Sequence, residues 1–291
     1  MTLPQIVHPL PYIQSYNHVV VDGNNCQLSN GTCLPTIRLE ATILILDSVF
    51  HGVYYHWLFD VIPKLLLLIQ EEIAFDAILI PTLNREFQME ILRIFGGTIP
   101  IISTQNERIL VRRAIFVSKL TSGITPLPWA LSVLSKALVA VTPTKAHEKI
   151  YISRDRATNR RVINELELFD ILAYHGFEVI YLEELSVIDQ ITLFSVVKSI
   201  IAPHGSGLSN IIFSKMKPKI LELTGPRCGE TCFVRLAHFV NAPYLAMQCP
   251  ENRHTNALNR LTSMASDSFN KWDYHVDPVQ FERVLTSYFN E

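Results

Sequence analysis

The sequence contains SIIAPHGSGLSNIIF at residues 199–213, and this stretch decides the fold. Its first five residues are mostly apolar and predict a buried strand that ends at Pro203. The chain then turns through Gly205-Ser206-Gly207 and enters a segment whose apolar residues recur with helical spacing. A buried strand, a glycine turn and a helix in this order are typical of a parallel α/β sheet.

The same alternation continues on both sides of this stretch. In the second half we expect strands at 149–153, 177–182, 199–203, 218–223 and 244–248, and helices at about 164–175, 186–198, 208–214 and 232–240. In the first half we expect strands at 41–49 and 76–81, an extended stretch at 108–118, and helices at 57–72, 84–95 and 129–141. The pattern predicts an α/β protein with two Rossmann-like, doubly wound domains.

The boundary between these domains is predicted near residue 145. An N-terminal α/β domain then covers residues 1–145 and a C-terminal α/β domain covers 146–291, with the last helix at about 277–290 a candidate to pack back on the first domain. Open α/β sheets bind ligands beyond the carboxyl ends of their strands, so two such domains are expected to face one another across a ligand-binding cleft.

Composition narrows the function classes. The 291 residues are 48% hydrophobic and 18% charged, which excludes a disordered or fibrous chain. The formal charge of -2 offers no broad basic surface, so we expect no nucleic-acid partner. Neither a secretory signal nor an apolar stretch of about 20 residues is present. Five cysteines, an odd number, favour reduced thiols, and we expect a cytoplasmic protein.

The glycine turn is a candidate anion site. Glycines let the backbone approach a ligand, and the start of a helix offers unpaired N–H groups with partial positive charge. His204 adds a hydrogen-bonding side chain, and the turn Gly205–Leu208, including Ser206, is followed by Asn210 one turn into the helix. A tight turn with a core-facing histidine is the alternative.

A second candidate segment is IYISRDRATNRRVINE at residues 150–165. A strand ends at Ser153-Arg154, and a polar loop then brings three further arginines, Arg156, Arg160 and Arg161, ahead of Asn164-Glu165 at a helix start. Guanidinium groups pair with phosphate oxygens through two hydrogen bonds, so this position suits a diphosphate. A solvated basic loop is the alternative.

A third candidate is the pair His56 and Asp60, four residues apart. On a helix they share a face, where the carboxylate can orient the imidazole or act as a base itself. Pro63 requires either a kinked helix or a helix that begins at Asp60 as its N-cap, with His56 in the loop.

Two polar groups in the second half complete the candidates. Glu222, among apolar neighbours in a strand, needs a partner such as a ligand hydroxyl or an arginine if it points inward, whereas at a sheet edge it would face water. Cys228 and Cys232 are accompanied nearby only by His238, so we expect no zinc site and no other metal.

Taken in this order, the segments resemble glycosyltransferase family 61, which includes bacterial capsule-type enzymes, plant xylan transferases and animal O-linked N-acetylglucosaminyltransferases. The resemblance covers about residues 51–224. Its matching pieces are His56-Trp57, Asp60, Pro63, Ile152-Ser153-Arg154, Arg160, Asn164-Glu165, Gln190, and the stretches 203–213 and 220–223. Ser206 and Ser209 stand where the family more usually has alanine and threonine.

The resemblance implies a GT-B fold and inverting, metal-independent transfer of a sugar from a nucleotide diphosphate, by default UDP, to a hydroxyl of a glycan or lipid-linked glycan. Arg154, Arg160, the 204–210 turn and Glu222 would then hold the donor. One of His56 and Asp60 would be the base, and the sequence leaves open which. The absence of any Asp-x-Asp motif fits a reaction without a metal cofactor.

The short chain is most similar to bacterial members of the family, which implies surface-polysaccharide (capsule) biosynthesis in the cytoplasm or at the inner face of the membrane, with peripheral association left open. Three alternatives remain. A polysaccharide pyruvyl transferase would use phosphoenolpyruvate, and a non-catalytic scaffold subunit would bind a nucleotide sugar without turnover. A dinucleotide-dependent oxidoreductase is disfavoured because the turn lacks the third glycine of that fingerprint.

Overall fold

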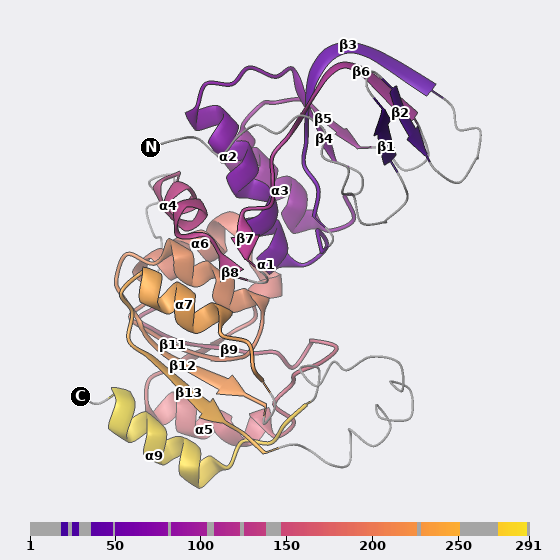
Figure 1. Cartoon of the computed structure of the whole chain (residues 1–291). Helices are drawn as coiled ribbons and strands as arrows, with labels where there is room; N and C mark the ends of the chain where they lie inside the picture. Colours follow the sequence, from indigo (N-terminus) through magenta and orange to yellow (C-terminus); the bar gives the residue numbers. More distant parts are fainter. Residues whose placement is uncertain are drawn as a thin grey trace. The chain divides into compact units, whose positions relative to one another are not determined.

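The structure is a computed structural model of the chain (Figure 1). It describes residues 19–22, 25–28, 36–48, 50–80, 83–103, 108–122, 125–137, 147–225, 228–250 and 273–289. The chain divides into two compact units, Met1–Ala137 and Leu138–Glu291. The predicted boundary at residue 145 falls outside the described residues.

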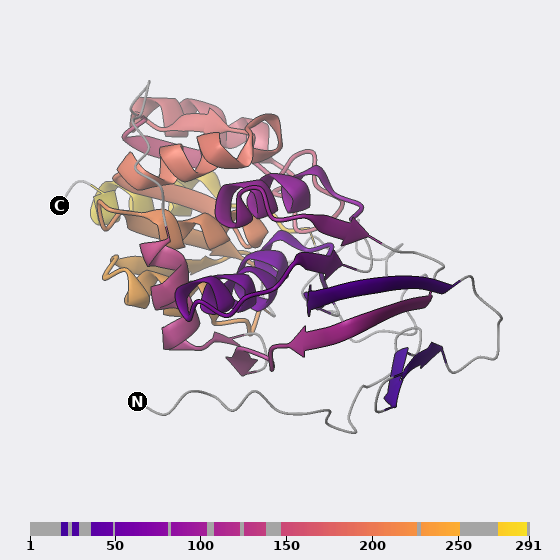
Figure 2. The ribbon, with the colours of Figure 1, turned by 90° about the horizontal axis from the view of Figure 1, so that it is seen from above.

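The first unit contains a four-stranded parallel sheet in the order β5-β4-β3-β6. The strands are β3 (Thr36–Ile45), β4 (Ala77–Ile80), β5 (Ile101–Ser103) and β6 (Arg108–Phe116). Figure 2 shows β3 and β6 as long strands running side by side. The predicted strand at 41–49 covers only the more buried half of β3. The prediction misses residues 36–40, because they are largely exposed and form no apolar run.

Helices and two short ribbons complete this unit. The longer helices are α2 (Ile62–Gln70), α3 (Glu86–Gly96) and α4 (Pro128–Lys136), and α2 contacts both of the others. The antiparallel ribbons are β1 (Val19–Asp22) with β2 (Asn25–Leu28), and β7 (Thr121–Ser122) with β8 (Thr125–Pro126).

The second unit contains a five-stranded parallel sheet in the order β10-β9-β11-β12-β13. The strands are β9 (Lys149–Ile152), β10 (Glu178–Ile180), β11 (Ser199–Pro203), β12 (Lys219–Thr224) and β13 (Tyr244–Gln248). All five predicted strands are present. The chain therefore runs outward from β9 to β10 and then returns to the other side of β9, which is the order of a doubly wound sheet.

Helices cover both faces of this sheet (Figure 1). On one face lie α5 (Glu165–Tyr174) and α9 (Pro278–Phe289). On the other lie α6 (Val187–Val196), the 3₁₀ helix η3 (Ser206–Phe213) and α7 (Cys232–Phe239), after a short 3₁₀ turn η2 (Leu182–Glu184). The segment predicted as a helix at 208–214 is thus 3₁₀, and the other predicted helices of this unit are α-helical.

The last helix belongs to the second unit. Phe281 and Leu285 of α9 are fully buried in one cluster with Leu168 and Leu172 of α5 and with Leu221 of the sheet. The apolar face of this helix therefore packs in the core of its own unit. The sequence had suggested instead that the helix packs back on the first domain. No helix among the described residues is long and apolar enough to cross a membrane.

Candidate functional site

The two predicted phosphate-binding segments meet at one point of the second sheet. β9 and β11 are neighbours, and the strand order reverses between them. Arg154 follows the carboxyl end of β9, and Gly205 follows the carboxyl end of β11. Ligands of open α/β sheets bind at such a reversal, because the loops leaving the two strands diverge to opposite faces and leave a crevice.

A cavity of about 320 Å³ lies at this reversal. Ser153, Arg154, Pro203, Gly205 and Gly207 line it from the strand ends, and Arg156 and Glu183 line it from the loops. Ser153, Gly205, Gly207, Leu208 and Arg154, all predicted for donor binding, therefore share one concave surface. His204, Glu222 and Asn210 are not among the residues that line it.

Arg154 supplies the central positive charge of this cavity. Its Nη2 donates to the backbone oxygen of Asn159 at 3.0 Å, which fixes the direction of the side chain. Its Nε is buried and has no hydrogen-bond partner in the part of the chain that the structure describes. Burial, helped by the neighbouring charge of Arg160, lowers the pKa of Arg154 to about 10. A guanidinium that lines a cavity is suited to an anionic ligand.

The glycines of the turn leave room for two neighbouring side chains. A Cβ at Gly205 would overlap Nη1 of Arg154 and lie 2.9 Å from its Cζ. A Cβ at Gly207 would lie 2.6 Å from Cδ1 of Leu182. Gly205 precedes η3 and has no side chain to cap it, so this helix begins at the cavity, which Gly205 and Gly207 line. Arg154 and the start of η3 thus both contribute positive charge beside the cavity.

The other arginines of the loop have different partners. Arg156 forms an ion pair with Glu184 and stacks over the ring of Tyr181 at 4.2 Å. Arg160 has a φ of 57°, and its Nε donates to Oδ1 of Asn159 at 3.3 Å. Both lie in the loop that leaves β9, and Arg156 lines the cavity.

Three predicted donor-binding residues instead hold the second unit together. Arg161 donates through Nε and Nη2 to Oδ2 of Asp273 at 3.2 and 2.9 Å. Asn164 donates to the carbonyl of Val276 at 2.8 Å. Glu165, which is buried, accepts from Ser153 Oγ at 2.6 Å and from a buried tyrosine hydroxyl. Their assignment to donor binding stays a prediction, while their polar atoms have partners within the chain.

Asn210 has a similar supporting position. It is fully buried, and its Nδ2 donates to Oε1 of Gln190 at 2.9 Å. Gln190 in turn donates to the carbonyls of Leu182 and Leu185 at 2.9 and 3.2 Å. The pair therefore fixes the loop that carries η2 against η3, and with it one wall of the cavity.

His204 lies behind the turn, between two carboxylates. Nδ1 is 2.7 Å from Oε1 of Glu222, and Nε2 is 2.7 Å from Oε2 of Glu230. The hydroxyl of Tyr244 donates to the second oxygen of Glu222. Burial acts to lower the pKa of His204, but hydrogen bonds to Cys228, Glu222 and Glu230 outweigh burial and raise the pKa to about 11. Glu222 thus points inward, but its partners are His204 and Tyr244 and not the ligand hydroxyl or arginine that the sequence suggested.

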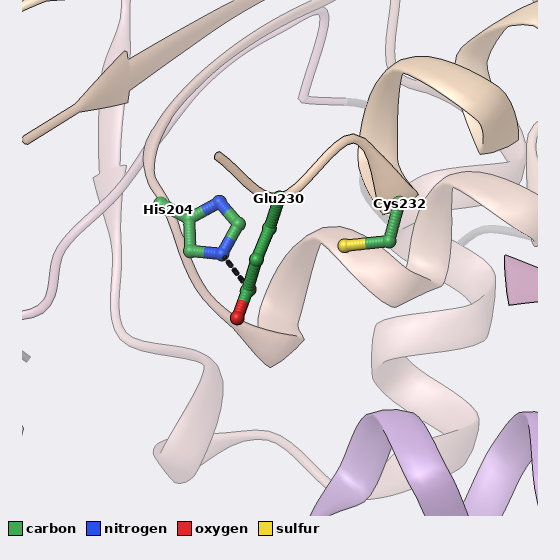
Figure 3. A group of neighbouring side chains, drawn as sticks. All are labelled: His204, Glu230 and Cys232. Carbon is green, nitrogen blue, oxygen red and sulfur yellow. Dashed lines mark hydrogen bonds and ion pairs between the residues drawn. The ribbon is translucent and has the colours of Figure 1, made fainter. Parts of the chain in front are cut away.

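Glu230 was not predicted, and Figure 3 shows it beside His204 with Cys232 next to it. These three residues bring a ring nitrogen, a carboxylate oxygen and a sulfur within 4.8 Å of one another. The sequence offers no signal for this contact. The histidine that lies near the cysteines along the chain is His238, whereas the fold brings His204 to them. Burial, with the charges of Glu230 and Glu222, raises the pKa of Cys232 to about 12.

The first unit carries the predicted pair His56 and Asp60. Nδ1 of His56 is 2.8 Å from Oδ2 of Asp60, and Ser48 Oγ donates to the same oxygen at 3.2 Å. Asp60 is 7% exposed, and the ring of Phe50 lies 4.9 Å from that of His56. The carboxylate is therefore held by two partners and fixes the orientation of the imidazole.

A π-helical turn explains how the pair tolerates Pro63. The helix runs on from α1 (Tyr54–His56) through the π segment η1 (Trp57–Val61) into α2. The amide of Ile62 bonds to the carbonyl of Trp57, five residues back, so the ladder widens just before the proline, which has no N–H to offer. Asp60 is inside this helix, and the alternative in which it is the N-cap is wrong. π turns of this kind are frequent at functional sites.

A buried lysine lies next to this pair. Nζ of Lys64 donates to the carbonyl of Asp47 at 2.9 Å. Burial lowers the pKa of Lys64, and the charges of Asp60 and Asp47 oppose that shift. The carboxylate of Asp60 thus also balances a positive charge one turn along the helix.

The family assignment follows from the comparison of sequences. The family model described as Glycosyltransferase 61 matches residues 54–221, which include the histidine–aspartate pair, the arginine loop and the glycine turn. The protein is a glycosyltransferase. It belongs to glycosyltransferase family 61. No curated protein matches the chain.

Two solved structures of the E. coli heptosyltransferase WaaC are similar to this chain at low identity. The complex with ADP is 10% identical, with a TM-score of 0.37, and the match covers 77% of this chain and 96% of that one. The complex with ADP-2-deoxy-2-fluoro heptose is 11% identical, with a TM-score of 0.37, and covers 79% and 100%. The family assignment rests on the sequence match alone.

Proposed function

We propose that this glycosyltransferase moves a sugar from a nucleotide diphosphate, UDP by default, to a hydroxyl of a glycan or lipid-linked glycan, with inversion and without a metal cofactor, in surface-polysaccharide biosynthesis. The observation that carries the proposal is Arg154. Its guanidinium lines the cavity at the reversal of the parallel sheet, beside a turn of glycines. A diphosphate can accept hydrogen bonds both from the planar guanidinium group and from the backbone amides at the start of η3.

The leaving group is stabilised by the second unit in this proposal. As the bond from the anomeric carbon to the diphosphate oxygen breaks, negative charge accumulates on the diphosphate. Arg154 and the first amides of η3 face that charge from fixed positions, and such preorganised donors stabilise a transition state without reorganising. Arg160, next to Arg154, adds to the positive potential.

The acceptor is activated by the first unit. Because Asp60 holds Nδ1 of His56, the tautomer with a proton on Nδ1 leaves Nε2 as the basic atom. In our proposal Nε2 takes the proton of the acceptor hydroxyl while its oxygen attacks the anomeric carbon from the face opposite the diphosphate. In this proposal His56 is the base and Asp60 is its positioning residue.

A binding experiment tests the donor site. A ligand that prefers the folded state raises the melting temperature, by the equivalent of about 2.7 kcal/mol at a concentration of 100 Kd. We expect a shift with UDP that is the same with and without added Mg²⁺ or Mn²⁺. Stabilisation by phosphoenolpyruvate alone would instead support a pyruvyl transferase, and stabilisation by NAD alone an oxidoreductase. Either result would overturn the proposed donor.

Turnover separates an enzyme from a scaffold. Purified protein is incubated with UDP sugars and a glycan acceptor, and UDP release and the anomeric configuration of the product are measured. Binding of UDP without turnover of any UDP sugar would favour the non-catalytic alternative. A product that retains the donor's configuration would contradict the inverting mechanism.

A further inference from the structure

The cluster behind the glycine turn has the arrangement of a metal site. Nε2 of His204, a carboxylate oxygen of Glu230 and Sγ of Cys232 all lie within 4.8 Å of one another. They come from the end of β11, from the loop after β12 and from the first residue of α7. Figure 3 shows Glu230 and Cys232 directed towards the ring of His204.

We propose that His204, Glu230 and Cys232 bind one Zn²⁺ ion, which ties the loop before α7 to the end of β11. This site goes beyond the proposed transfer, in which no metal takes part. The ion would be structural, and it would hold His204 immediately before the turn that lines the donor cavity.

The other ring nitrogen of His204 faces a carboxylate. A histidine that binds a metal almost always donates its other ring N–H to a carboxylate or carbonyl, which fixes the tautomer. Nδ1 of His204 is 2.7 Å from Glu222, and Tyr244 donates to the other oxygen of that carboxylate. Tyr244, Glu222 and His204 therefore form a hydrogen-bonded chain that presents Nε2 to the cluster.

The donor set selects the metal. A thiol and an imidazole favour Zn²⁺ over Mg²⁺ and Ca²⁺, which prefer oxygen ligands only. Tetrahedral zinc separates its nitrogen, oxygen and sulfur ligands by about 3.3–3.8 Å, so the present arrangement needs side-chain shifts of about 1 Å or less. A water completes the fourth position.

Two of the three side chains of the cluster are buried. His204 is 2% exposed and Cys232 is 4% exposed, whereas the Glu230 side chain is 33% exposed. Glu230 therefore provides the side of the cluster that solvent reaches, and an ion can enter past it. Binding must displace protons from the ligands, so the affinity for zinc is expected to fall as the pH is lowered.

Metal content and a cobalt spectrum test the site on the full chain without a histidine tag. We expect about one zinc per chain after growth with zinc and gel filtration, measured by mass spectrometry of the elements. After removal of zinc with a chelator, Co²⁺ should give the near-ultraviolet charge-transfer band of a thiolate ligand, and zinc should abolish it.

Variants identify the ligands. Cys232→Ala should abolish the cobalt–thiolate band, and both Cys232→Ala and Glu230→Gln should weaken zinc binding at least about 100-fold. Cys249→Ala is the matched control, because Cys249 is also a buried free thiol but lies outside the cluster. If Cys232→Ala does not fold, the spectrum of the unaltered protein still decides. No zinc and no cobalt band, or binding unchanged in both variants, would overturn the proposal and leave His204 as an imidazolium between two carboxylates.

Discussion

The guanidinium of Arg154 lies against Gly205, so closely that a methyl group at position 205 would overlap Nη1. The two residues follow neighbouring strands, β9 and β11, between which the strand order reverses. The absence of a side chain at one position is therefore what leaves space for the charge at the other. Two sequence motifs that are far apart along the chain therefore line one cavity, which we propose binds the diphosphate.

Gly205→Ala should weaken UDP binding by displacing that guanidinium. Gly205 has a φ of 174°, an extended conformation open to alanine, so the backbone itself is not strained. We expect at least a tenfold weaker affinity for UDP in calorimetry and only a small change in melting temperature without ligand. Gly229→Ala is the control, because a Cβ there meets nothing within 4 Å. Unchanged affinity in Gly205→Ala would show that Arg154 does not contact the nucleotide.

Arg154→Ala should abolish the thermal shift caused by UDP. Arg154→Lys should restore only part of it, because an ammonium keeps the charge but not the planar fork that pairs with two phosphate oxygens. Removing a bidentate charged contact is expected to weaken UDP binding by about 100-fold. Arg283→Ala, an exposed arginine on α9, should bind UDP normally. An Arg154→Lys variant equal to the unaltered protein would argue against bidentate contact.

The parallel sheets were predictable because their strands are short apolar runs separated by amphipathic helices. β11 is the clearest case, since all five of its residues are buried. Convergence of the arginine loop and the glycine turn also followed from the sequence, because parallel strands end at the same edge of a sheet. By contrast, β5 has three residues, two half-buried and one exposed, and leaves too weak a pattern to find.

Contacts made by loops after the strands were not predictable. Glu230 reaches His204 only because the segment after β12 folds back over the end of β11, and nothing in its composition specifies that path. The partner of Arg161 is equally remote, because Asp273 is 112 residues further along the chain. An arginine that the sequence suggests for phosphate binding can thus form an ion pair with a carboxylate that is distant in the sequence and close in the fold.

His56→Ala and Asp60→Asn should both slow sugar transfer if they form a base and its positioning residue. Losing a general base costs about 10²–10⁴-fold in rate, so His56→Ala should lower kcat by at least about 100-fold with little effect on UDP affinity. Asp60→Asn should also lower kcat, because the carboxylate that holds Nδ1 of His56 is lost. Circular dichroism checks that both variants fold.

His51→Gln is the matched control for these variants. His51 lies close by in the chain, and its Nδ1 contacts the carbonyl of Ser48 rather than a carboxylate. Its kcat should stay within about twofold of the unaltered value, as a group outside the proton transfer has no part in the transition state. A rate that falls in Asp60→Asn but not in His56→Ala would reverse the two roles and make Asp60 the base.

Asp273→Ala should destabilise the second unit without removing the nucleotide site. Asp273, 5% exposed, accepts from the backbone amide of Arg161 at 2.9 Å and from both Nε and Nη2 of its side chain. The next residue, Tyr274, pairs with Val162 and donates its hydroxyl to the carbonyl of Leu223. Leaving these donors unpaired is expected to cost about 2–4 kcal/mol of unfolding free energy.

Denaturant unfolding measures that loss, and Asp170→Asn, an exposed carboxylate on α5, is the control expected to change it by less than about 0.5 kcal/mol. The thermal shift with UDP should persist in Asp273→Ala, because neither Asp273 nor Arg161 lines the cavity. An opposite pattern, with stability unchanged and UDP binding lost, would return Arg161 to the donor site that its sequence position suggests. The free energy of unfolding of Arg161→Ala then separates the two cases. If Arg161 stabilises the fold through Asp273, its removal must lower that free energy, whereas the loss of an arginine that only binds a ligand need not.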